Sequence, residues 1–169
     1  MWQQPDACYA LTRGIDLQGI TWVGPLVDSF SGALDGRGHT LNNLYIQGTE
    51  ELGLFGQLHG SVENLDIEQA LIWGLGGDYI GTICGIDRGY ITQCNADTIV
   101  IGYDYVGGVS GKNMRVGCGQ SNVRDSHTSG SVIGHDYVGG IIGYGGAENC
   151  TSDCSVVGHD YVGQLFGDD

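Results

Sequence analysis

A short motif with an acid beside a tyrosine occurs four times in this sequence, and its carboxylates and imidazoles could bind a divalent cation. The copies are GGDYIG, GYDYVG, GHDYVG and GHDYVG, at residues 76–81, 102–107, 134–139 and 158–163. Their acids are Asp78, Asp104, Asp136 and Asp160, the last two preceded by His135 and His159, and Glu50 takes the acid place in an earlier copy.

Two roles are open for this acidic column. Carboxylates alone suit Ca²⁺, and carboxylates with imidazoles suit a transition metal. The glycine pair and spacing of the calcium-binding nonapeptide repeat are missing, however. We therefore predict that each carboxylate accepts a hydrogen bond from its own turn and points outward. The alternative is a row of divalent cation sites, with Ca²⁺ at the carboxylates or a transition metal at the histidines. No resident cofactor is predicted.

The tyrosines of the motif form a second column of identical residues. The residue after each tyrosine is always a branched aliphatic one, as in Tyr105–Val106, and a residue of that kind belongs in a core. Since side chains alternate along a strand, the tyrosines should point outward, and Glu51 in the earlier copy fits that prediction. We predict an exposed contact ladder of stacked rings that stabilises the fold and could bind a glycan or a neighbouring subunit. Its members are Tyr79, Tyr105, Tyr137 and Tyr161.

Asp28, Asp35 and His39 are the best candidates for enzyme chemistry. Clustered carboxylates with an acid or base are what polysaccharide lyases and glycoside hydrolases need. Asp35 and His39 lie in the glycine turn DGRGH, and no nucleophile–base pair accompanies them. We therefore predict that the protein is not an enzyme and has no catalytic residue. A carbohydrate-active β-helix enzyme or a glycan-binding module remains the alternative.

The repetition itself predicts the fold. The motif tyrosines lie 26, 32 and 24 residues apart, and each copy holds short strand-like segments separated by Gly, Asn or Asp turns. Such units must stack coil on coil, with equal positions about 4.8 Å apart. We predict one all-β domain over 1–169, a right-handed parallel β-helix (β-solenoid) of about six coils. Residues 1–47 form irregular coils and 48–169 repeat coils, with a loop insertion at 112–121. An antiparallel sandwich also uses short strands but does not predict such columns.

Charge and hydropathy restrict the partners. Twenty acidic and six basic residues give a formal net charge of −14, which disfavours nucleic acid and anionic lipid. No apolar run reaches membrane-spanning length, so no membrane insertion is predicted, and no signal peptide is visible.

The six cysteines match neither a zinc site nor a disulfide framework, because no CxxC pair exists. We predict that at least three of them are buried thiols. One aligned column, Leu65, Cys94, Ser126 and Cys150, is predicted to face inward.

The first third of the chain resembles the entry segment of bacterial and archaeal repeat proteins that carry the GLUG motif. That segment runs Y-x-L-x-x-x-I-D-L…W, then F-x-G-x-x-D-G-x-G-H-T-I-x-N-L-x-I, then G-L-F-G, which occurs here at 53–56. The matching residues are Tyr9, Leu11, Ile15, Asp16, Leu17, Trp22, Phe30, Gly32, Asp35, Gly36, Gly38, His39, Thr40, Asn43, Leu44 and Ile46.

This resemblance implies a right-handed parallel β-helix in an adhesin-like protein at the cell surface or outside the cell, with no shared catalytic residues. We therefore expect a non-enzymatic structural or adhesive surface module or a subunit of an extracellular fibre. Its expected partners are copies of itself, a glycan or a surface protein.

Overall fold

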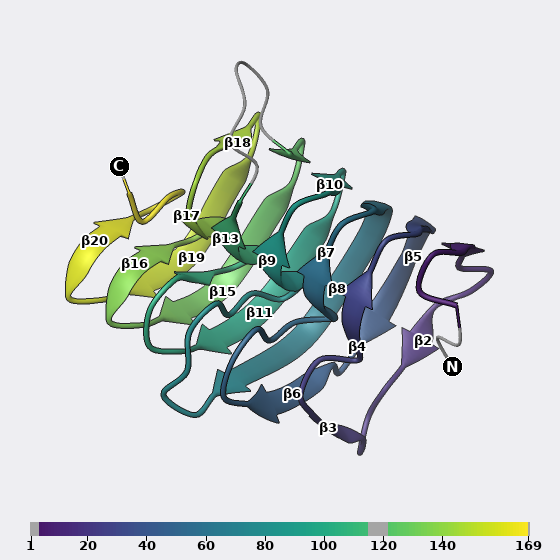
Figure 1. Cartoon of the computed structure of the whole chain (residues 1–169), viewed down its shortest axis with the longest axis horizontal. Helices are drawn as coiled ribbons and strands as arrows, with labels where there is room; N and C mark the ends of the chain where they lie inside the picture. The colour runs from purple at the N-terminus through teal and green to yellow at the C-terminus, as the bar shows by residue number, and fades with distance from the viewer. Residues whose placement is uncertain (1–3, 115–121, 169) are drawn as a thin grey trace.

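The chain forms a parallel β-solenoid of about six turns, as predicted. This computed structural model describes residues 4–114 and 122–168. Figure 1 shows the coils side by side in chain order, from purple near the N-terminus to yellow at the C-terminus. The described residues form strands and turns only, so this part of the chain holds no helix that could cross a membrane.

Three parallel sheets run along the solenoid, and we call them sheets A, B and C. Sheet A has twelve strands: β1 (Cys8–Ala10), β2 (Ile15–Asp16), β3 (Thr21–Val23), β5 (Ala33–Asn42), β6 (Tyr45–Gly48), β8 (Ser61–Gly74), β10 (Tyr90–Thr92), β11 (Asn95–Ile101), β14 (Val123–Arg124), β15 (His127–Ile133), β18 (Ala147–Glu148) and β19 (Thr151–Val157). Sheet B has β4 (Val27–Phe30), β7 (Phe55–Leu58), β9 (Cys84–Asp87), β13 (Ser110–Asn113) and β17 (Ile142–Tyr144). Sheet C has β12 (Val106–Gly107), β16 (Asp136–Gly139) and β20 (Asp160–Gly163).

The register between coils matches the repeat alignment. In sheet C, Val106 pairs with Val138 and Val138 with Val162, and single bridges extend this column back through Ile80 to Leu52. The positions after the motif tyrosines therefore stack, one per coil.

This stacked column faces the core, as predicted. Leu52, Ile80, Val106 and Val138 are buried, whereas Val162 in the last coil is partly exposed. In the column predicted from the cysteine positions, Leu65, Cys94 and Ser126 are buried and Cys150 is half-buried. Phe30 and Phe55 stack inside the core with ring centroids 4.6 Å apart.

Each coil turns a corner at residues with a left-handed backbone, which non-glycine residues adopt at a cost of about 1–2 kcal/mol. The tyrosine position is one such corner: Glu51 has φ 50°, Tyr79 62°, Tyr105 57°, and Tyr137 and Tyr161 55°. A second corner column holds Asn64, Gln93, Asp125 and Asn149, with φ from 49° to 54°. Asn and Asp suit this conformation by themselves, but tyrosine does not, so its place in the corner needs another stabilising contact.

The cysteines among the described residues are free thiols, in agreement with the prediction. Cys84, Cys94 and Cys154 are buried, Cys150 is half-buried and Cys8 is exposed. Burial raises the pKa of Cys94 to about 12 and that of Cys84 well above its ordinary value, so both thiols are unreactive. The sixth cysteine, Cys118, lies outside the described residues.

The first two residues of the predicted insertion at 112–121 lie in a strand. Lys112 and Asn113 belong to β13, where Lys112 pairs with Ile86 on one side and Tyr144 on the other. Residues 115–121 lie outside the described residues. The first 47 residues contain the short strands β1 to β4, all of β5 and most of β6, with an irregular register between Asp35 and His39.

The stacked core column should carry much of the stability. We expect Ile80→Ala to lower the free energy of unfolding by about 2–5 kcal/mol, because it leaves a cavity between two coils. The matched variant Ile99→Ala removes the same atoms from an exposed position on sheet A and should cost under about 1 kcal/mol. Urea denaturation measures both values, and equal losses would show that Ile80 is not a core residue.

Candidate functional site

Three adjacent columns form one edge of the solenoid, which we call the ladder edge. It contains the stacked tyrosines (Tyr79, Tyr105, Tyr137, Tyr161), the acids before them (Asp78, Asp104, Asp136, Asp160) and the residues before those (Tyr103, His135, His159). In the last two coils these residues lie in or next to β16 and β20, whose pairing sets their spacing. Each column therefore repeats once per coil.

The tyrosine column is an outward ladder of stacked rings, as predicted. Ring centroids lie 5.0 Å apart between Tyr79 and Tyr105, 4.8 Å between Tyr105 and Tyr137, and 4.5 Å between Tyr137 and Tyr161. The planes deviate by 12° or less. Such pairs contribute about 0.5–1.5 kcal/mol each, which offsets the left-handed backbone at the same residues.

The stacking determines which parts of the tyrosine rings a partner molecule can reach. Tyr105 and Tyr137 each have a ring on both sides, so their faces are covered, and only their edges and hydroxyls point away from the ladder. The inner rings of the predicted contact ladder can therefore meet a partner only with their edges and hydroxyls. Tyr161, which is 57% exposed, has a second face that no ladder ring covers.

Lys112 and Tyr144 flank the ladder, and the sequence analysis missed both. The Lys112 ammonium lies 4.5 Å from the Tyr105 ring centroid and 5.2 Å from that of Tyr144, within the range of cation–π attraction. Tyr144 meets Tyr137 edge to face at 5.5 Å. Lys112 and Tyr144 each follow a glycine-bracketed step, GGVSG and GGIIG, so extending the repeat alignment by one residue would have placed them in one column.

The acidic column holds adjacent coils together, and here the predicted turn is wrong. The carboxylates of Asp78, Asp104 and Asp136 each accept a hydrogen bond from the next coil instead of from their own turn. The backbone N–H of Asp104 donates to Asp78 Oδ1 over 3.1 Å, that of Asp136 to Asp104 Oδ1 over 3.0 Å, and that of Asp160 to Asp136 Oδ1 over 3.2 Å. These charge-assisted bonds offset the repulsion between stacked acids, about 0.8 kcal/mol per pair in a water-like dielectric.

The histidines continue the column that starts with Gly77 and Tyr103. Tyr103 stacks on His135 at 4.7 Å, and His135 on His159 at 5.0 Å. At Gly77 a side chain is excluded, because a Cβ atom there would lie 1.0 Å from the carbonyl oxygen of Thr49. The aromatic column can therefore begin only at Tyr103.

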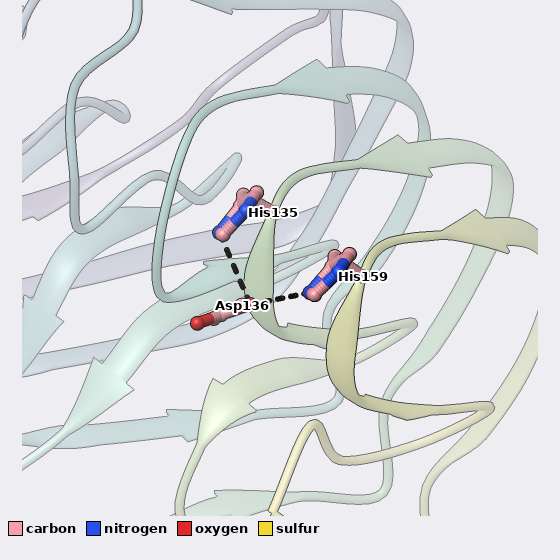
Figure 2. Close-up of side chains that lie close together, drawn as sticks. All are labelled: His135, Asp136 and His159. Carbon is pink, nitrogen blue, oxygen red and sulfur yellow. Dashed lines mark ion pairs between the residues drawn. The ribbon is translucent and has the colours of Figure 1, made fainter.

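The two imidazoles alternate with carboxylates along the edge, and Figure 2 shows Asp136 between them. Asp136 Oδ1 lies 3.1 Å from His135 Nδ1 and 3.8 Å from His159 Nδ1. Asp104 Oδ1 lies 3.5 Å from His135 Nδ1, and Asp160 Oδ2 lies 3.3 Å from His159 Nδ1. Three of the predicted site residues, His135, Asp136 and His159, thus have ligand atoms within 4.8 Å of one another.

The enzyme candidates lie elsewhere, and Asp35 forms hydrogen bonds within the solenoid. Asp35 Oδ1 accepts hydrogen bonds from the Arg37 N–H over 2.8 Å and from Asn64 Nδ2 over 3.2 Å. The Arg37 bond is the main cause that lowers the pKa of Asp35, followed by Asn64. Asp28 lies on β4 of sheet B and lines a mostly apolar pocket of about 600 Å³, whereas Asp35 and His39 lie on β5 of sheet A.

Comparison with known proteins gives one partial match. No family model matches the chain, and no solved structure matches it. Halomucin from Haloquadratum walsbyi (strain DSM 16790 / HBSQ001) is 36% identical over 88 residues, which are 50% of this chain. The chain covers 1% of the length of halomucin. This match does not test the resemblance to GLUG-motif proteins, which stays a prediction.

The tyrosine ladder should make stability depend on alkaline pH. Burial raises the pKa of the Tyr105 and Tyr137 hydroxyls, and the neighbouring tyrosines and acids raise it further. The folded state therefore holds these protons more tightly than the unfolded chain, whose tyrosines titrate near pH ~10. This contribution to stability is complete below that pH and is lost as the pH rises through the higher folded values.

We expect the double variant Tyr105→Phe, Tyr137→Phe to lose less melting temperature than the parent between pH ~8 and ~10.5. Thermal melts followed by circular dichroism measure the difference. Tyr90→Phe, outside the ladder, is the control and should behave like the parent. Equal losses in the parent and the double variant would show that the ladder hydroxyls titrate normally.

Proposed function

We propose that this chain is a non-enzymatic structural module at the surface of a prokaryotic cell or in an extracellular fibre, and that it associates with copies of itself. The observation that carries the proposal is that the repeated residues form continuous columns along the solenoid surface. A binding or catalytic pocket needs different residues converging at one place, whereas a column offers the same contact once per coil.

A row of exposed apolar side chains on sheet A is the proposed contact surface. Trp73, Ile101, Ile133 and Val157 pair in register across β8, β11, β15 and β19. Trp73, Ile133 and Val157 are 42%, 38% and 53% exposed, and Ile99 in the neighbouring row is also exposed. A contiguous apolar patch of this kind is typical of an interface.

A second copy of the chain fits this row by its periodicity. The side chains repeat at the coil spacing, so the same row on another molecule offers the matching repeat. Acids beside it, such as Asp97 and Asp153 on the same face, carry the same sign on both copies. The net charge of −14 opposes association at low ionic strength, and added salt screens this repulsion.

The location rests on the comparison with halomucin. Half of this chain resembles a segment of a far longer protein whose name marks it as a mucin-like protein. That likeness supports a place at or outside the cell surface and a role as one module of a larger architecture. The engagement of Asp35 in hydrogen bonds within its own coil and with the next coil supports the non-enzymatic part of the proposal.

We expect the purified chain to be mainly monomeric in dilute buffer and to form dimers or larger species in about 1 M NaCl, where the Debye length is about 3 Å. The double variant Ile133→Ser, Val157→Ser should remain monomeric at both salt concentrations. Sedimentation velocity measures the species, and circular dichroism checks that the variant is folded.

Tyr137→Ser is the matched control for this experiment. It removes two ring stacks and should lower stability by about 1–3 kcal/mol while leaving association unchanged. A chain that stays monomeric in high salt, or associates only when the ladder is intact, would contradict the proposed surface.

A glycan-binding module is the second candidate, and the exposed Tyr161 ring beside the acidic column favours it. Retention of the chain on an immobilised polysaccharide, abolished by Tyr161→Ser and retained in Ile133→Ser, Val157→Ser, would favour that function over self-association. Cleavage of the polysaccharide that depends on Asp35 would instead indicate the carbohydrate-active enzyme.

A further inference from the structure

We propose that His135, Asp136 and His159 bind one divalent transition metal ion, such as Zn²⁺, which joins the last two coils of the ladder edge. The three side chains come from β16 and the residues just before β16 and β20, and Asp136 lies between the two parallel imidazole rings (Figure 2). This inference does not depend on the proposed self-association, because the site lies on the ladder edge and not on the apolar row.

The spacing of the donor atoms fits a small metal ion. Ligand atoms held about 2.0–2.2 Å from a tetrahedral Zn²⁺ lie roughly 3.3–3.6 Å apart. Asp136 Oδ1 lies 3.1 Å from His135 Nδ1, just below this range, and 3.8 Å from His159 Nδ1, just above it. All three ligand atoms lie within 4.8 Å of one another. An ion bound by all three needs the two imidazole nitrogens, which lie up to 4.8 Å apart, to approach each other by about 1 Å.

An unsatisfied atom at the centre of the cluster points independently to a ligand. His135 Nδ1 is inaccessible to solvent and makes no hydrogen bond of acceptable geometry, although it faces Asp136 Oδ1 and, at 3.5 Å, Asp104 Oδ1. Buried polar atoms nearly always have a partner. A metal ion bound to this nitrogen would supply one.

The surroundings supply orientation and further donors. The backbone N–H of Asp160 donates to Asp136 Oδ1 and fixes this carboxylate between the rings. Asp104 Oδ1 and Asp160 Oδ2 flank the histidines and could complete the coordination. Each ring must tilt so that its nitrogen lone pair faces the ion, since the two planes now deviate by only 3°. The side chains of His135 and His159, which are 42% and 69% exposed, have room to tilt.

The donor set selects the class of metal. Imidazole nitrogens suit Zn²⁺, Cu²⁺, Ni²⁺ and Co²⁺, whereas Ca²⁺ and Mg²⁺ require oxygen ligands. The ion would bind the unprotonated nitrogens. A proton on each ring would instead give ion pairs with the same carboxylates, without any metal.

Isothermal titration of the metal-stripped chain with Zn²⁺ at about pH 7.5 tests the proposal. We expect one ion per chain, and no competition from excess Ca²⁺ or Mg²⁺. Because an ion bound only by the folded chain stabilises it, Zn²⁺ at about 100 times its Kd should raise the melting temperature by about 5–10 °C. With Co²⁺ as the probe, visible absorption bands should report nitrogen and oxygen ligands.

The chain offers matched variants. His135→Tyr and His159→Tyr remove one ligand each but keep a ring in a column where Tyr103 already stacks, so the edge should stay folded. Each should weaken Zn²⁺ binding at least tenfold. His127→Asn removes another exposed histidine near an acid, Asp153, and should leave affinity unchanged.

Unchanged affinity in His135→Tyr and His159→Tyr would overturn the proposal, as would the absence of stoichiometric binding in the parent. An equal loss of affinity in His127→Asn would also overturn it, because binding would then be spread over surface histidines.

Discussion

The distance between successive coils is the constraint on which the rest of this structure depends. Backbone N–H and C=O groups pair across every coil boundary, which fixes neighbouring strands about 4.8 Å apart. Every side-chain column inherits that spacing, as the tyrosine rings at 4.5–5.0 Å and the histidine rings at 5.0 Å show. A residue type that is attracted to a copy of itself at this distance stabilises the whole edge. A residue type that is repelled by its copy needs another favourable contact to offset the repulsion.

The ladder edge contains both cases. Flat aromatic rings attract one another at this spacing, and their stacking makes the left-handed corner tolerable for tyrosine. Carboxylates repel one another, and hydrogen bonds from the backbone amides of the next coil to Asp78, Asp104 and Asp136 compensate for this repulsion. The histidines also reduce the repulsion between carboxylates. His135 lies beside Asp104 and Asp136, and His159 lies beside Asp136 and Asp160. The same alternation produces the proposed metal site.

The sequence predicts what depends on periodicity. The inward position of Val106 and Val138 and the outward position of the tyrosines follow from alternation along a strand, and both are observed. The hydrogen-bond donors to the aspartate carboxylates could not be predicted in this way. A carboxylate that accepts a bond from its own turn and one that accepts a bond from the next coil have the same sequence pattern. The role of Lys112 was missed because the repeat that contains it is longer than the others, so the sequence analysis assigned Lys112 to a loop. The exposed row of Trp73 and Ile133 was missed because apolar residues on a strand suggest a core until the register is known.

Amide hydrogen exchange at the aspartates of the ladder edge tests most directly the claim that each carboxylate holds the next coil. In Asp104→Ala, the amide of Asp136 loses its acceptor and should exchange about tenfold faster than in the parent, corresponding to roughly 1.4 kcal/mol. Asp104→Asn keeps an oxygen acceptor and should preserve most of the protection. The amide of Asp160, which donates to Asp136, should be unaffected in both variants and so report local change only. Unchanged exchange at Asp136 in Asp104→Ala would contradict the account, because the carboxylate would then contribute nothing to the junction between the coils.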